Sequence, residues 1–125
     1  MTQKQQFIAI YLGSPDSAAM ARWKTLSPEA MAQRQQQGLA AWHAWAKQHH
    51  ASIALMGGPL GPALRVATQG VAQTANAISG FTIVEAKSAQ AAAALFKNPP
   101  HFAIFPGEAM EIMPIMPVPR QGVVR

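Results

Sequence analysis

The sequence predicts an α+β fold of the ferredoxin-like βαββαβ type, with an antiparallel sheet that carries two helices on one face. Short apolar runs typical of strands and two helix-forming stretches follow one another in that order. The chain has 125 residues, the usual size of one domain. Half of its residues are hydrophobic and only 12% are charged, which argues against disorder. We therefore expect a single domain over residues 1–125.

The first half of the chain begins with a strand and a long helix. Residues 6–12 form a short apolar run, ended by glycine, serine and proline, which indicates a buried strand. Ser27 is a helix N-cap followed by Pro28 at the first helical position, and helix-forming residues continue to about His50. Three- and four-residue spacing defines one face of this helix, which includes Met31, Trp42, Trp45 and His49.

The middle of the chain predicts two further strands. Residues 52–56 form the first of them, and it is followed by a glycine- and proline-rich bend over 57–62 and a short continuation over 63–66. Residues 68–79 are polar and small, and we expect a loop there. The clearest strand covers 80–86, where alternation places Phe81, Ile83 and Glu85 on one side.

The last part of the chain predicts a helix, a strand and a tail. Ser88 caps an alanine-rich helix that ends near Asn98, because Pro99-Pro100 disfavours a helical residue before it. Residues 109–113 form the final strand. Three prolines make residues 114–125 a proline-rich C-terminal tail at the edge of the sheet.

This order of elements leaves one face of the sheet without helices. That face is apolar, and something must cover it. A second copy packed sheet to sheet would cover it and would account for the low share of charged residues. We therefore expect a homodimer in the form of a dimeric α/β barrel.

Composition excludes several classes of protein. The chain has no cysteine, so disulfide frameworks, zinc–thiolate sites and cysteine nucleophiles are excluded. The net charge is +5, but the basic residues are scattered along the chain, and we expect no nucleic-acid partner. No apolar stretch reaches the roughly 18 residues of a membrane span. The N-terminus has no signal-peptide pattern, so we expect a cytoplasmic protein without membrane contact.

Several ordered motifs resemble the YCII-related (DGPF-motif) family. They are Trp42-His43-Ala44-Trp45, Met56 to Pro62, Ile78 to Ala86 with Ser88, Asn98-Pro99-Pro100-His101, and Glu111-Ile112-Met113. The resemblance covers about Phe7 to Pro117 and implies a ferredoxin-like fold that dimerises into an α/β barrel. The DGPF tetrapeptide itself is absent. Some members use a His–Asp pair near the cleft, but the only aspartate here, Asp16, falls in the loop after the first strand.

Candidate catalytic residues are His101, Glu85 and Glu111. His101 follows two prolines at the family's Pro-His position, and a histidine pKa of about 6.5 suits general acid–base work. Each glutamate falls inside an apolar strand, where an acid is unusual unless it is paired or faces a pocket. The alternatives are a structural histidine, a Glu85 at the emerging end of its strand, and a Glu111 paired with Arg65 or Arg120.

Candidate ligand-binding residues are Trp45, His49, Phe81 and Arg65. For Trp45 the alternative is a position in the core. For His49 the alternative is a stabilising position at the helix C-terminus, where the helix dipole favours a histidine. No set of histidines and acids has metal-ligand spacing, so we expect neither a metal nor a cofactor.

Two hypotheses for function follow. The first is a dimer that binds a small apolar or aromatic molecule in an apolar cleft near His101. The alternative is a small cofactor-independent enzyme of lyase or isomerase type, in which His101 is the general acid or base.

Overall fold

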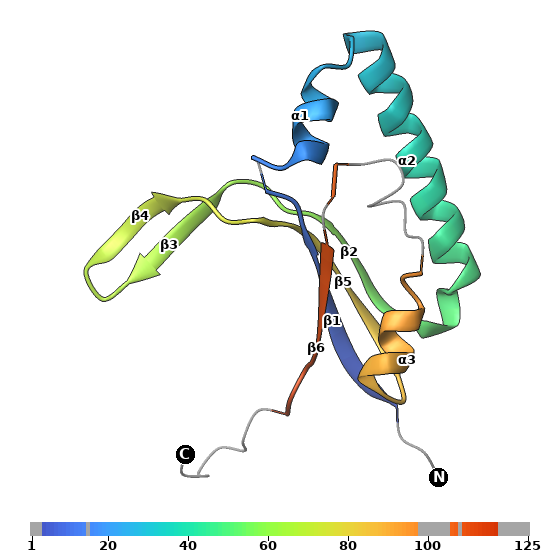
Figure 1. The fold of residues 1–125 in the computed structure, drawn as a ribbon. Helices are drawn as coiled ribbons and strands as arrows, with labels where there is room; N and C mark the ends of the chain where they lie inside the picture. Colours follow the sequence, from blue (N-terminus) through green and yellow to red (C-terminus); the bar gives the residue numbers. More distant parts are fainter. Residues whose placement is uncertain (1–3, 15, 98–105, 108, 118–125) are drawn as a thin grey trace.

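The computed structural model describes residues 4–14, 16–97, 106–107 and 109–117. Its main sheet has four strands in the order β2-β5-β1-β6, and every neighbouring pair is antiparallel. The strands are β1 (Gln5–Leu12), β2 (Ile53–Pro59), β5 (Ile78–Ala86) and β6 (Ala109–Pro114). With its crossing helices on one face (Figure 1), this order is the ferredoxin-like arrangement, which confirms the predicted fold class.

The two predicted helices begin where their capping residues indicate. Helix α2 (Pro28–Gln48) starts after Ser27, whose hydroxyl accepts a hydrogen bond of 3.1 Å from the Ala30 amide. Helix α3 (Ala89–Ala94) starts after Ser88, which caps it in the same way. Helix α3 is shorter than expected, because regular helix ends at Ala94 and not near Asn98.

One helix was missed by the sequence analysis. Helix α1 (Ala18–Lys24) lies in the stretch between β1 and α2, with Ser17 as its N-cap. It has seven residues and none of them is buried, so no apolar stripe marks it in the sequence.

The predictions for the middle of the chain were partly wrong. Strand β2 continues into the predicted bend over 57–62 and ends at Pro59. Strands β3 (Ala63–Ala67) and β4 (Gly70–Thr74) then pair as a separate antiparallel hairpin, so residues 68–79 are not a simple loop. Every residue of β4 is exposed, and a strand without a buried side shows no apolar alternation. In Figure 1 the hairpin projects away from the main sheet.

The core lies between the sheet and the helices. On β1 the buried residues are Phe7, Ala9 and Tyr11, and on β5 Thr82, Val84 and Ala86 are buried. Trp45 of α2, Ala92 of α3 and Phe96 complete this cluster. The predicted alternation along 80–86 is confirmed, since Phe81, Ile83 and Glu85 lie on the other face.

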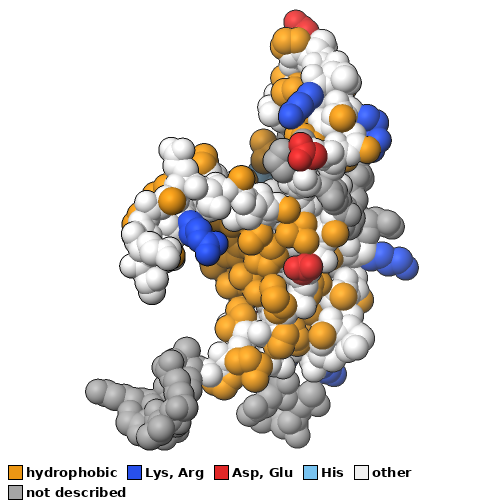
Figure 2. Space-filling model, turned by 60° about the vertical axis from the view of Figure 1, so that its left-hand side comes forward, with side chains coloured by type: hydrophobic (Ala, Val, Ile, Leu, Met, Phe, Trp, Pro, Cys, Tyr) orange, Lys and Arg blue, Asp and Glu red, His pale blue; other side chains and the backbone are white. Residues whose placement is uncertain are grey.

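Among the residues that the structure describes, no helix lies on the opposite face of the sheet, and we call it the open face. Cross-strand register places Ile83, Ile8 and Met113 in one row across it, and Phe81, Ile10 and Glu111 in the next. Figure 2 shows apolar side chains gathered over the sheet, with a hollow between them and the β3–β4 hairpin. The open face is therefore an apolar surface that none of the described helices covers.

Tyr11 is held in the core by a hydrogen-bond chain. The Thr82 hydroxyl donates to the Met56 carbonyl at 2.8 Å, so the Tyr11 hydroxyl donates to Thr82 Oγ1 at 2.5 Å. Burial raises the pKa of Tyr11 from 10.0 to about 12.

The raised pKa of Tyr11 predicts a loss of stability in alkali. The folded protein holds this proton up to about pH 12, while the unfolded chain releases it near pH 10. The free energy of unfolding should therefore fall by about 2–3 kcal/mol between pH 10 and 12 through this group alone. Urea unfolding across that range measures the loss.

Tyr11→Phe is the control, because Tyr11 is the only tyrosine of the chain. This variant keeps the ring in the core and should lose less stability over the same pH range. Equal pH dependence in both proteins would contradict the assignment to Tyr11.

Candidate functional site

A groove lies between the C-terminal end of α2 and the segment that includes α3. Its volume is about 460 Å³. The residues that line it are Ala41, Ala44, Trp45, Gln48, His49, Ala94, Leu95 and Lys97. Four of the eight are small or aliphatic, and the polar groups come from the end of α2 and from Lys97.

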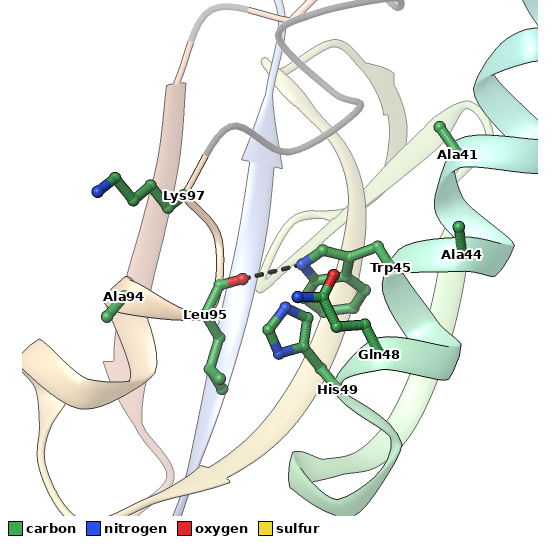
Figure 3. Close-up of a pocket in the computed structure, with 8 residues that line it drawn as sticks. All are labelled: Ala41, Ala44, Trp45, Gln48, His49, Ala94, Leu95 and Lys97. Atoms are coloured by element: carbon green, nitrogen blue, oxygen red, sulfur yellow. Dashed lines mark hydrogen bonds between the residues drawn. The ribbon is translucent and has the colours of Figure 1, made fainter.

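Trp45 forms the aromatic wall of this groove. Its indole is 7% exposed, and the indole N–H donates a hydrogen bond of 2.9 Å to the Leu95 carbonyl (Figure 3). It stacks on Phe96 with ring centroids 4.9 Å apart and meets Trp42 edge to face at 5.3 Å. Trp45 is thus both a core residue and a groove residue, so the two interpretations of its position are compatible.

His49 is the C-cap of α2, and its ring lies against the tryptophan. The two ring centroids are 5.2 Å apart, and the rings are tilted by 49°. In Figure 3 the Gln48 amide and the His49 imidazole lie close together beside the indole, while the Lys97 side chain points away from them. One end of the groove thus pairs aromatic surface with groups that both donate and accept hydrogen bonds.

The groove and the open face lie on opposite sides of the sheet. Trp45 and His49 belong to the helix side, whereas Phe81, Glu85 and Glu111 lie on the open face. The structure therefore brings the first two predicted residues together and places the other three elsewhere.

The two candidate carboxylates are far apart within one chain. Glu85 is opposite Gln6 and Glu111 is opposite Ile10, on the two sides of β1. Four residues along a strand and two strand spacings across the sheet separate them by roughly 16 Å. Within one chain they do not form the close carboxylate pair that acid–base chemistry on one substrate requires.

Arg65 and His101 complete the predicted set. Arg65 lies on β3 of the projecting hairpin and is exposed. His101 and Arg120 lie outside the described residues. Among the residues that the structure describes, no group of three or more histidines, cysteines or acids is placed to hold a metal ion.

Sequence reasoning did not identify Gln48, Leu95 and Lys97 as groove residues. Gln48 directly precedes His49 and ends the same helix. Its position next to His49 in the sequence could therefore have identified it as a groove residue. Leu95 contributes its main-chain carbonyl, and no pattern of side chains predicts a hydrogen bond to a main-chain group.

Comparison with known proteins gives a likeness to a solved structure. No protein-family model matches the chain, and no curated protein sequence matches it. The fold is similar to that of 5-chloro-2-hydroxyhydroquinone dehydrochlorinase from Burkholderia phenoliruptrix AC1100, solved in complex with 2,5-dihydroxybenzoquinone, with a TM-score of 0.46 and 20% identity. The match covers 86% of this chain and 90% of the dehydrochlorinase. Within the described residues, no helix is long and apolar enough to cross a membrane.

Proposed function

We propose that the protein is a homodimer of the YCII-related kind that binds a small aromatic molecule in the groove beside Trp45. One observation carries this proposal: His49 and Gln48 lie beside the indole at one end of the groove. The site thus combines apolar surface with a few convergent polar groups, as small-molecule sites do.

The chemistry of the groove indicates a planar ligand with polar substituents. The His49 ring, beside the largely buried indole, offers aromatic surface against which a ligand ring can stack or pack edge to face. The amide of Gln48 and the imidazole can each donate and accept, which suits a hydroxyl or carboxylate on that ring. Among the described residues that line the groove none is acidic, so we propose binding at this site and not acid–base catalysis by a carboxylate there.

Tryptophan fluorescence provides the test of this binding site. We expect a monocyclic phenol or aromatic acid, drawn from a small panel, to quench the emission of the protein saturably. His49→Ala should raise the dissociation constant of that ligand about tenfold or more, because it removes a stacking and hydrogen-bonding group. His50→Ala is the matched control, since this neighbour is exposed and does not line the groove.

Two results would count against the proposal. If no compound of the panel quenched saturably, the groove would not be an aromatic-ligand site. If His49→Ala and His50→Ala weakened binding equally, the ligand would bind elsewhere.

The open face supports the homodimer. Its central rows consist mainly of isoleucine, phenylalanine and methionine, and no helix in the described part of the chain lies on them. Leu55 on β2, opposite Ile83, is 52% exposed, and Met113 on β6 is 44% exposed. Monomeric proteins rarely leave a continuous apolar surface of this kind in water. A second copy that presents the same face would bury both.

The sheet and the hairpin together expose a large part of the area that a stable dimer buries. Nine large aliphatic side chains of β2, the hairpin, β5, β6 and the following residues are between 39% and 78% exposed. At about 100 Å² of apolar surface for a fully exposed side chain, they present roughly 500 Å². Partly exposed Phe81, Ile8, Ile10 and Ile83 add to this, against about 800 Å² per partner in a standard interface.

A further inference from the structure

The β3–β4 hairpin extends the paired strands β2 and β5 beyond the main sheet. Among the described strands, β3 and β4 pair only with each other, and a two-stranded hairpin on its own is marginally stable in water. Leu64, Val66 and Val71 are 67%, 78% and 65% exposed. These three side chains share one side of the hairpin, and the opposite side, which carries Arg65, is left to meet a partner surface.

The hairpin also carries an isolated positive charge. Arg65 is the only charged residue between Lys47 and Glu85 in the sequence. Register places it beside Ala72 and on the same side as Ala63 and Ala67, so its neighbours on that side are small. A long guanidinium side chain surrounded by small residues can reach a group on an opposing surface.

Glu111 is the complementary charge, because it lies inside the apolar part of the open face. It is opposite Ile10, whose other neighbour is Phe81, and along its own strand it falls between Ala109 and Met113 on that face. If a second copy covered the open face, the Glu111 carboxylate would lose water, and it would then require a cation.

Glu85 is placed differently on the same face. It is opposite Gln6, near the end of the sheet where β1 begins and β5 ends. There its carboxylate can stay in water when the apolar rows are covered. The need for a partner cation therefore applies to Glu111.

The position of the hairpin relative to the sheet fits this pairing. The hairpin leaves the sheet where β2 ends and β5 begins, and the row of Glu111 is near that same end. Two sheets in a sandwich keep their strand directions within about 30° of each other. If the twofold axis runs parallel to the strands, this end of one sheet lies over the same end of the other sheet. The same axis places β6 of one copy over β2 of the other, next to the hairpin.

We propose that, in the homodimer, the β3–β4 hairpin of each copy reaches over the open face of the other, where Arg65 forms an ion pair with the partner's Glu111. This inference rests on the proposed homodimer and names the surface and the charges that hold it. The hairpin is an arm that closes the interface, and each interface contains the ion pair twice.

Charge reversal tests the pairing, with the dimer dissociation constant measured by analytical ultracentrifugation. We expect the wild-type chain to be dimeric at micromolar concentration. Arg65→Glu and Glu111→Arg should each raise the dissociation constant about thirtyfold or more, because each places like charges together in a covered interface. The double variant, R65E with E111R, should return it to within about threefold of the wild-type value.

Lys47→Glu is the matched control, since it makes the same change of charge on an exposed position of α2, on the other side of the sheet. It should leave the dissociation constant unchanged, and circular dichroism should show that every variant folds. A monomeric wild-type chain would overturn the homodimer and this inference with it. A dimeric wild type with an equally dimeric Arg65→Glu, or rescue of Arg65→Glu by Glu85→Arg in place of Glu111→Arg, would overturn this inference alone.

Discussion

Replacement of Gly57 by alanine should lower the free energy of unfolding by about 3 kcal/mol or more. Gly57 lies in β2 with φ of 66°, a conformation that L residues rarely adopt. A Cβ atom there would stand 2.2 Å from the carbonyl oxygen of Phe81 and 3.0 Å from its carbonyl carbon. Both are backbone atoms of the neighbouring strand β5, so the sheet itself would have to shift. Urea unfolding of the variant measures the loss.

Gly58→Ala is the matched control for this prediction. The next residue belongs to the same strand, yet a Cβ atom at Gly58 meets nothing within 4 Å. We expect this variant to stay within about 0.5 kcal/mol of the wild type, as surface substitutions usually do. If both variants lost the same stability, the cause would be a general preference for glycine in β2 and not the close approach of Phe81.

Most of the fold could be predicted because its helices and strands carry local sequence signals. Ser27 and Ser88 mark helix starts, since a hydroxyl before a helix satisfies amide groups of the first turn. The alternation along 80–86 separates buried from open-face residues, since successive side chains of a strand point to opposite faces. The alternation appears in the sequence because one side of the strand contacts the core.

The elements that were missed lack that contact. Helix α1 has no buried residue, and β4 is exposed along its whole length. Without a buried side, neither shows the apolar period on which the prediction depends. The hairpin is ordered by pairing between β3 and β4, which sequence periodicity does not record.

The site was predictable residue by residue but not as a whole. Spacing along α2 placed Trp45 and His49 on one face, and the structure sets their rings 5.2 Å apart. The same kind of reasoning placed Phe81 and Glu85 on one face of β5. The spacing of apolar residues does not indicate which face of the sheet lies under α2. Residues from both faces of the sheet were therefore predicted as one site. Only the sheet order and the helix positions separate them.

Trp45→Ala should be the most damaging substitution in the helix layer, with an expected loss of about 3–5 kcal/mol. The indole is buried between α2 and the segment that follows α3, and it stacks on Phe96. Truncation leaves a cavity and also leaves the Leu95 carbonyl without the indole N–H. Because small domains are stable by about 5–15 kcal/mol in total, the variant should unfold at much lower urea than the wild type.

Trp45→Phe separates the contributions of the ring and the hydrogen bond. Phenylalanine retains aromatic packing against Phe96 but has no N–H to donate to Leu95. We expect it to lose about 1–2 kcal/mol and to fold with its groove largely intact, so that an aromatic ligand still binds to it. If Trp45→Ala were as stable as Trp45→Phe, the indole would not anchor the segment after α3 to α2. Contacts among the other aromatic residues would then hold the wall of the groove in place.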